Sequence, residues 1–116
     1  MSTDQIIDQE AIENLRALDD GDGEDSFLKE VIEIFVSDTP ERINELRTSF
    51  AADDQVTFTR AAHSIKGSSS NVGAIILGRL AKDLEADSRE SIRGLGPRID
   101  ALDAAFLEAK RVLQAL

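Results

Sequence analysis

The sequence contains no cysteine, tryptophan or tyrosine, and it has only one histidine and two prolines. The lack of cysteine excludes disulfides, zinc–thiolate sites and cysteine nucleophiles. A single histidine does not support a serine triad, a transition-metal site or a di-iron bundle site. The lack of tryptophan and tyrosine removes the aromatic platform on which single-stranded nucleic acids stack. Classical enzyme chemistry therefore has few residues to work with.

Positive charge and long apolar runs are also scarce. The chain has 13 Lys and Arg against 23 Asp and Glu, which gives a net charge of −10. This balance argues against nucleic-acid and membrane partners, because phosphate backbones and anionic lipids repel an acidic protein. No run approaches the roughly 18 apolar residues of a membrane span, and residues 1–7 lack the features of a signal peptide. We expect a cytoplasmic, monomeric protein.

Apolar residues instead recur at helical spacing along most of the chain. The periodic segments span roughly residues 8–18, 26–52, 55–70, 74–88 and a last one that begins near Ser91 or at Pro97. No sustained alternation of β-branched residues predicts a strand. Four long helices with short connections predict an all-α, antiparallel four-helix bundle.

At 116 residues the chain has the length of one domain, residues 1–116. We expect residues 26–116 to form the bundle. Residues 1–25 then supply a short extra N-terminal helix, which covers one end of the bundle, and an acidic turn.

The ends of the long helices carry recognisable signals. One apolar stripe runs straight through Pro40, which predicts a single bent helix; a break at residues 38–40 is the alternative. Asp53 or Asp54 is expected to cap the next helix. Gly73 suits the left-handed turn that would end it.

Acidic residues cluster in two places that bear on cation binding. Residues 19–26 have the composition of a calcium loop, but the register is wrong. Counted from Asp20, position six is Asp25, where glycine is needed, and position twelve is Val31, where glutamate is needed. We interpret the stretch as an acidic turn in which Asp25 or Ser26 caps the next helix. The second group, on one predicted helix, consists of Asp83, Glu85 and Asp87. Such acids bind a hard cation only weakly and are usually a solvated face.

His63 is predicted to lie opposite the apolar stripe of its helix. At 100° per residue the stripe consists of Phe58, Ala61, Ala62, Ile65, Ser69 and Val72. Arg60, Lys66, Gly67 and Ser70 fall within roughly 60° of His63. A lone histidine is more often a core residue or an incidental surface residue. The helical wheel argues against the core, and these neighbours argue against an incidental position.

An exposed, neutral imidazole can accept a phosphoryl group on a ring nitrogen. A nearby cation favours the neutral ring, and Lys66, one turn on, can meet the phosphoryl oxygens. Gly67 leaves room for a large protein donor, although glycine costs the helix about 1 kcal/mol relative to alanine. Ser70 lies at the rim of this face. The residues therefore predict nucleophilic chemistry by His63 alone.

Residues 63–74, HSIKGSSSNVGA, resemble the signature of histidine-containing phosphotransfer (HPt) domains, His-x-x-Lys-Gly-Ser-Ser-x-x-x-Gly-Ala. Residues 77–85 also resemble the family's fourth helix. The resemblance implies that His63 is phosphorylated, that Lys66 steadies the phosphoryl group and that Gly67 lets the partner approach. Glu85 falls where the family often has a polar residue, commonly Gln, near the histidine ring. A carboxylate at this position favours the charged imidazolium.

The resemblance implies a stoichiometric phosphoryl carrier, not an enzyme, in a two-component multistep phosphorelay. A receiver-domain aspartate would give its phosphoryl group to His63, and another receiver would take it. The implied partners are response-regulator receiver domains and a hybrid histidine kinase. The receiver supplies the acidic pocket and its Mg²⁺, so this chain needs no cofactor. The basic residues expected to steer that pocket are Arg60, Lys66, Arg79 and Lys82.

Two alternatives stay open. The first is the phosphoacceptor domain of a chemotaxis-type histidine kinase, which resembles the same His-x-x-Lys-Gly core. The second is a non-catalytic helical interaction bundle in which His63 is incidental. A dimerising kinase helix pair is disfavoured, because Ser64 follows the histidine where an acid is usual and the next proline is Pro97.

Overall fold

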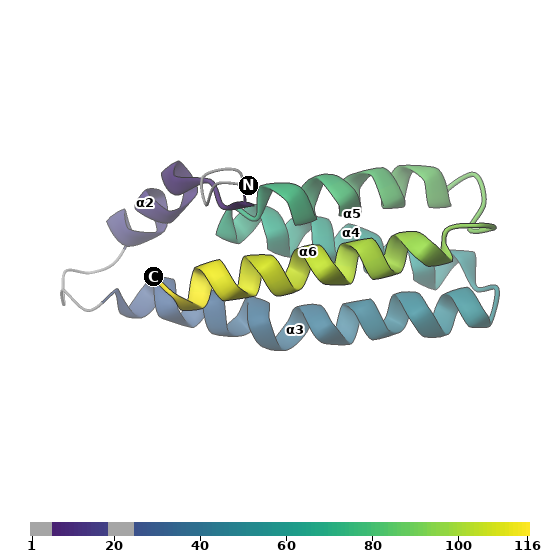
Figure 1. Cartoon of the computed structure of the whole chain (residues 1–116), viewed down its shortest axis with the longest axis horizontal. Helices are drawn as coiled ribbons and strands as arrows, with labels where there is room; N and C mark the ends of the chain where they lie inside the picture. Colours follow the sequence, from purple (N-terminus) through teal and green to yellow (C-terminus); the bar gives the residue numbers. More distant parts are fainter. Residues whose placement is uncertain (1–5, 19–24) are drawn as a thin grey trace.

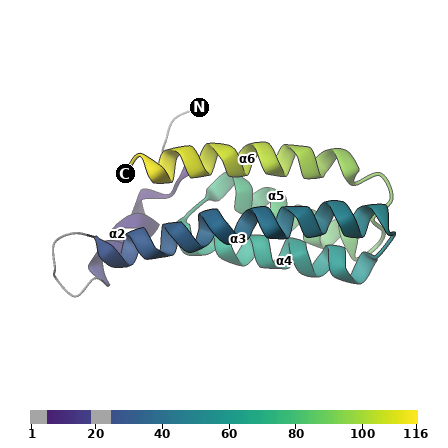
Figure 2. The same ribbon diagram turned by 90° about the horizontal axis from the view of Figure 1, so that it is seen from below.

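The computed structural model describes residues 6–18 and 25–116, and this part of the chain is helical (Figure 1). The helices are α2 (Gln9–Ala17), α3 (Ser26–Ala51), α4 (Gln55–Val72), α5 (Ile75–Ser88) and α6 (Gly96–Gln114). The four long helices lie lengthwise in an elongated molecule of 47 × 26 × 19 Å (Figures 1 and 2). The predicted all-α four-helix bundle with a short extra N-terminal helix is confirmed.

Each long helix packs against two others. Helices α4 and α6 each contact both α3 and α5, and α2 lies against α3 and α4 at one end of the bundle. All six residues of the predicted α4 stripe are buried. The opposite face of α4 is left to solvent, and that face carries His63.

Helix α3 continues unbroken through Pro40, so the alternative of a break at residues 38–40 is wrong. Pro40 is exposed, whereas its neighbour Thr39 is fully buried. The proline ring therefore faces water, and the loss of its N–H costs the helix one hydrogen bond. Packing of the apolar stripe of α3 against α4 and α6 holds the helix together across this position.

Gly73 ends α4 and anchors the N-terminal segment. Its φ of 69° is the predicted left-handed turn. The amide of Asp8 donates to the Gly73 carbonyl at 2.8 Å, and Ile7 forms an isolated antiparallel bridge with Ala74. A Cβ atom on Gly73 would lie 2.8 Å from the Cβ of Ala11. Both the backbone conformation and the close approach of α2 therefore require glycine here.

The other helix ends were predicted with mixed success. Asp54 caps α4 by accepting from the Thr57 amide at 3.1 Å. Asp25 occupies the N-cap position of α3, but its side chain does not cap the helix and instead pairs with Arg16 at 3.3 Å. Helix α6 begins at Gly96, with Pro97 in its first turn, so the start near Ser91 is wrong.

The helical spacing of apolar residues continues upstream of Pro97, although the helix does not. Ile92 and Leu95 are buried although they precede the helix, because the turn folds them into the core. Most of the acidic stretch 19–26 lies outside the described residues. Among the helices of the described residues, none combines the length and the apolar character that crossing a membrane requires.

Candidate functional site

His63 projects from the solvent-facing side of α4, and its side chain is 65% exposed. One edge of the ring is held. Nδ1 lies 2.8 Å from Oε2 of Glu85, which comes from α5 and whose side chain is only 5% exposed. His63 is thus exposed, as predicted. It also contacts Glu85, the residue that the family resemblance placed near the histidine ring.

The carboxylate of Glu85 is the centre of this cluster. Lys66 places its Nζ 2.8 Å from Oε1, and Arg89 places a guanidinium nitrogen 2.9 Å from Oε2. We call His63, Lys66, Glu85 and Arg89 the Glu85 cluster. A shielded carboxylate needs such partners, because burying an unpaired charge is costly. The hydrogen bond from Lys66 lowers the pKa of Glu85 most; desolvation raises it, and the hydrogen bond with His63 lowers it further.

The ionised carboxylate sets the tautomer of His63. A carboxylate without a proton can only accept hydrogen bonds, so Nδ1 of the neutral ring must carry the proton and donate it to Glu85. The lone pair is then on Nε2. Because Nδ1 is turned toward α5 and the side chain is largely exposed, Nε2 occupies the outward edge. The site therefore presents an oriented nucleophilic nitrogen to solvent.

Polar contacts fasten the end of α5 to the start of α4 near His63. The hydroxyls of Thr59 and Ser88 are 2.7 Å apart. The side-chain amide of Gln55 donates to the backbone carbonyls of Ser88 and Arg89 at 2.7 and 2.9 Å. These bonds place the last turn of α5, and with it Glu85 and Arg89, beside the histidine.

Sequence reasoning missed part of this contact face. Ile76 and Leu80 belong to the helical apolar pattern of segment 74–88, but both are only half-buried. Glu85 and Ser88 are buried instead, so the interpretation of Glu85 as part of a solvated acidic face is wrong. Arg89 was also missed, although its spacing of four residues from Glu85 is a recognised signal for an ion pair on one helix.

Beside His63 the surface forms a shallow hollow between α4 and α5. Its other lining residues are Gln55, Val56, Thr59, Arg60, Glu85 and Arg89. Val56 is 67% exposed, so the hollow has an apolar side chain open to solvent. The hollow thus combines an exposed apolar residue with two arginines next to the imidazole, features that are common in protein interfaces.

The remaining predicted site residues lie along the same face. Gly67 is exposed, and a Cβ atom built on it would meet no atom within 4 Å. Packing therefore does not explain a glycine here. Ser70 lies beyond Lys66, in a second groove that Lys66, Arg79 and Lys82 also line. The structure thus brings His63, Lys66 and Glu85 together and sets Ser70 apart from the imidazole.

The acids of α5 do not form a cation site. Asp87 pairs with Arg98 at 2.6 Å, and Asp83 is exposed. The carboxylate of Glu85 already contacts the side chains of the Glu85 cluster. Within residues 6–18 and 25–116, no group of three or more His, Asp or Glu side chains is arranged to hold a metal ion.

The chain is similar to proteins of one family. Residues 30–114 match the model of the Hpt domain. Among solved structures, histidine-containing phosphotransfer protein B (HptB) from Pseudomonas aeruginosa PAO1 is 25% identical, with a TM-score of 0.83 over 98% of this chain and 95% of that chain. The HPT domain of an Hpt sensor hybrid histidine kinase from Shewanella is 20% identical, with a TM-score of 0.67 over 80% of each chain. No curated protein sequence matches the chain.

Proposed function

Because this chain belongs to the Hpt domain family of phosphotransfer proteins, we propose that His63 is its phosphoacceptor and carries phosphoryl groups between receiver domains. One observation carries the assignment to this residue. The chain's single histidine is exposed on α4, and its Nδ1 is bonded to a shielded carboxylate, so that Nε2 faces the solvent. A phosphocarrier needs this arrangement, because the acceptor atom must be both nucleophilic and accessible to a protein donor.

In the proposed step, the Nε2 lone pair of His63 attacks the phosphorus of a receiver's phospho-aspartate. The P–Nε2 bond forms as the P–O bond breaks, and the electron pair of that bond leaves with the aspartate carboxylate. The proton on Nδ1 stays on the ring, which becomes positively charged. Glu85 stabilises this charge in the way that a buried carboxylate stabilises a catalytic imidazolium. Transfer to the next receiver is the reverse reaction.

Lys66 and Gly67 have supporting roles in this proposal. An ammonium group has three donors, so Lys66 can keep its bond to Oε1 of Glu85 and also donate to a phosphoryl oxygen. Gly67 gives the partner an unobstructed approach, since nothing lies within 4 Å of a Cβ at this position. Ser70 is proposed to contact the partner at the edge of the interface. The Mg²⁺ ion belongs to the receiver's acidic pocket.

Receivers are proposed as partners because of the charge of this face. Helix α4 contains no acidic residue, although the chain as a whole has a net charge of −10. The exposed cations of α4 and α5 that would attract an acidic pocket are Arg60, Arg79 and Lys82. The Shewanella relative is named as a domain of a sensor hybrid histidine kinase, which supports a kinase of that class as the source of the phosphoryl group.

The test is phosphoryl transfer from receivers. Each isolated receiver domain encoded in the same genome is phosphorylated with ³²P-acetyl phosphate and mixed with this protein. We expect acid-labile, base-stable label on the wild type and none on His63→Gln. If no receiver labels the wild type, or if the variant is labelled equally, the proposal is wrong. Label acquired only from an ATP-fed kinase domain would instead indicate the phosphoacceptor domain of a chemotaxis-type kinase.

A further inference from the structure

Arg89 binds the same carboxylate oxygen that accepts the hydrogen bond from His63. Its guanidinium lies 2.9 Å from Oε2 of Glu85, and Nδ1 of His63 lies 2.8 Å from that atom. We propose that Arg89 is a positioning residue that, together with Lys66, offsets the charge of Glu85 and so keeps the imidazole neutral and nucleophilic. The inference rests on the proposed role of His63 and names a residue outside the His-x-x-Lys-Gly motif.

The need for such compensation follows from the carboxylate itself. An ionised carboxylate beside an imidazole favours the imidazolium, which has no lone pair on Nε2 and cannot attack phosphorus. A neutral amide could orient the ring without this effect. In this chain both oxygens of Glu85 contact a cation, Lys66 at Oε1 and Arg89 at Oε2. The carboxylate therefore keeps its orienting bond while its charge is balanced.

The charged side chains around His63 are also mostly positive. From α4 the charged groups near the ring are Arg60 and Lys66, and from α5 they are Glu85 and Arg89. Three positive side chains thus lie near the ring against one negative side chain, and two of the three contact the carboxylate of Glu85. An additional positive charge on the imidazole is disfavoured in this setting until a phosphoryl dianion arrives on Nε2.

The local sequence of α5 provides a second, independent line of support. An acid in the last turn of a helix is opposed by the helix dipole, whereas a cation there is favoured. Glu85 lies in that turn and Arg89 at the C-cap, four residues later, which is the favourable order for an ion pair. The side-chain amide of Gln55 also donates to the backbone carbonyl of Arg89 at 2.9 Å, and this bond helps to fix the backbone from which the Arg89 side chain extends. The position of Arg89 in the chain therefore favours its ion pair with Glu85.

The experiment compares Arg89→Gln with Arg89→Lys and with the control Arg111→Gln. Arg111 is matched to Arg89, because both side chains are 65% exposed and each pairs with a glutamate of its own helix. The single histidine gives one Cε1–H signal by NMR. At pH 7 we expect this signal to move toward the position of the protonated ring in Arg89→Gln and to stay unchanged in Arg89→Lys and Arg111→Gln. No movement in Arg89→Gln, or equal movement in Arg89→Lys, would overturn the inference.

A second readout uses phosphoramidate, which needs no receiver. Nε2 attacks its phosphorus, the P–N bond breaks, and ammonia leaves with the electron pair. Relative to wild type, Arg89→Gln should react about two- to fivefold more slowly at pH 7, the factor expected for an exposed ion pair. The ratio should approach one as the pH is raised from 7 to 9, because charge compensation affects the rate only through protonation of the ring. A deficit that is the same at both pH values contradicts charge compensation.

A double-mutant cycle separates charge compensation from a structural role. In a Glu85→Gln background there is no carboxylate charge to offset, so adding Arg89→Gln should change the phosphoramidate rate by less than about twofold. An undiminished effect would show that Arg89 does not act through Glu85. These outcomes are independent of the relay proposal, which fails only if receivers do not label His63.

Discussion

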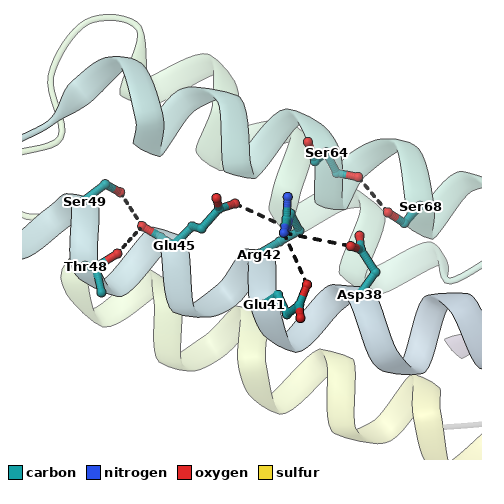
Figure 3. Close-up of polar contacts among 8 residues, drawn as sticks. All are labelled: Asp38, Glu41, Arg42, Glu45, Thr48, Ser49, Ser64 and Ser68. Atoms are coloured by element: carbon teal, nitrogen blue, oxygen red, sulfur yellow. Dashed lines mark hydrogen bonds and ion pairs between the residues drawn. The ribbon is translucent and has the colours of Figure 1, made fainter.

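Within the described residues, two clusters place three side chains around one charged group, and the two differ in shielding and in the helices that supply the partners. In the Glu85 cluster, the carboxylate contacts Lys66, Arg89 and the imidazole of His63. In the second, which we call the Arg42 cluster, the guanidinium of Arg42 lies 3.2 to 4.0 Å from three acids of its own helix, as Figure 3 shows. Those acids are Asp38, Glu41 and Glu45.

The partners of Arg42 all lie within four residues of it on α3, and each is more than 40% exposed. Exposed pairs of this kind are worth little, because water and salt screen them. The partners of Glu85 come from two helices, and Glu85 itself is shielded. Both clusters have three partners, so shielding and tertiary placement, not the number of partners, distinguish the cluster that contacts the imidazole.

The largest expected effect is on phosphorylation of His63. Glu85→Ala removes the group that fixes the Nδ1–H tautomer, and we expect the rate to fall about 10- to 100-fold, as for other residues that orient a functional histidine. Arg42→Ala should stay within about twofold of wild type, because the Arg42 cluster does not touch the imidazole. The measurement is ³²P uptake from a phosphorylated receiver. If the phosphorylation rate falls equally in Glu85→Ala and Arg42→Ala, the two clusters do not differ in function.

The next effect is the pH dependence of stability. Folding lowers the pKa of Glu85 below its ordinary value of 4.5, chiefly through Lys66. Its ionised form therefore stabilises the fold above pH 4.5, and this contribution is lost as the pH falls through the lowered pKa. Glu85→Gln should be less stable than wild type at pH 7, and the difference should shrink toward pH 3.

Urea unfolding followed by circular dichroism at constant ionic strength measures this difference. The matched change in the Arg42 cluster is Glu45→Gln, which we expect to alter the free energy of unfolding by less than about 1 kcal/mol. A stability difference for Glu85→Gln that is as large at pH 3 as at pH 7 would show that the charge of Glu85 is not responsible.

The smallest effect concerns Gly67, beside the Glu85 cluster. Because a Cβ there meets nothing within 4 Å, Gly67→Ala should stabilise the protein by up to about 1 kcal/mol in urea unfolding. A bulky residue, as in Gly67→Arg, should slow labelling by a receiver and leave the reaction with phosphoramidate unchanged. Slowing with both donors would indicate damage to the site and not a blocked approach.

Much of the fold could be predicted because helical periodicity is a local property. The stripe of α4 has the predicted six residues, and the stripe of α3 explains why the helix continues past Pro40. The start of α6 was ambiguous for a tertiary reason. Ile92 and Leu95 keep the helical phase because both are buried, yet Gly94, with a φ of 77°, holds them in a turn.

The sequence alone determined that the chain has one histidine and that it faces away from the core, because both follow from composition and from 3.6 residues per turn. Only the tertiary structure decided how the groups that contact this imidazole are shielded and paired. Small residues let α5 approach α4 closely, since a Cβ on Gly78 would lie 3.4 Å from that of Ser69. In this packing Glu85, which the sequence alone grouped with exposed acids, is a shielded carboxylate 2.8 Å from His63. No local rule sets the rotation of one helix against another, so the arrangement depends on packing.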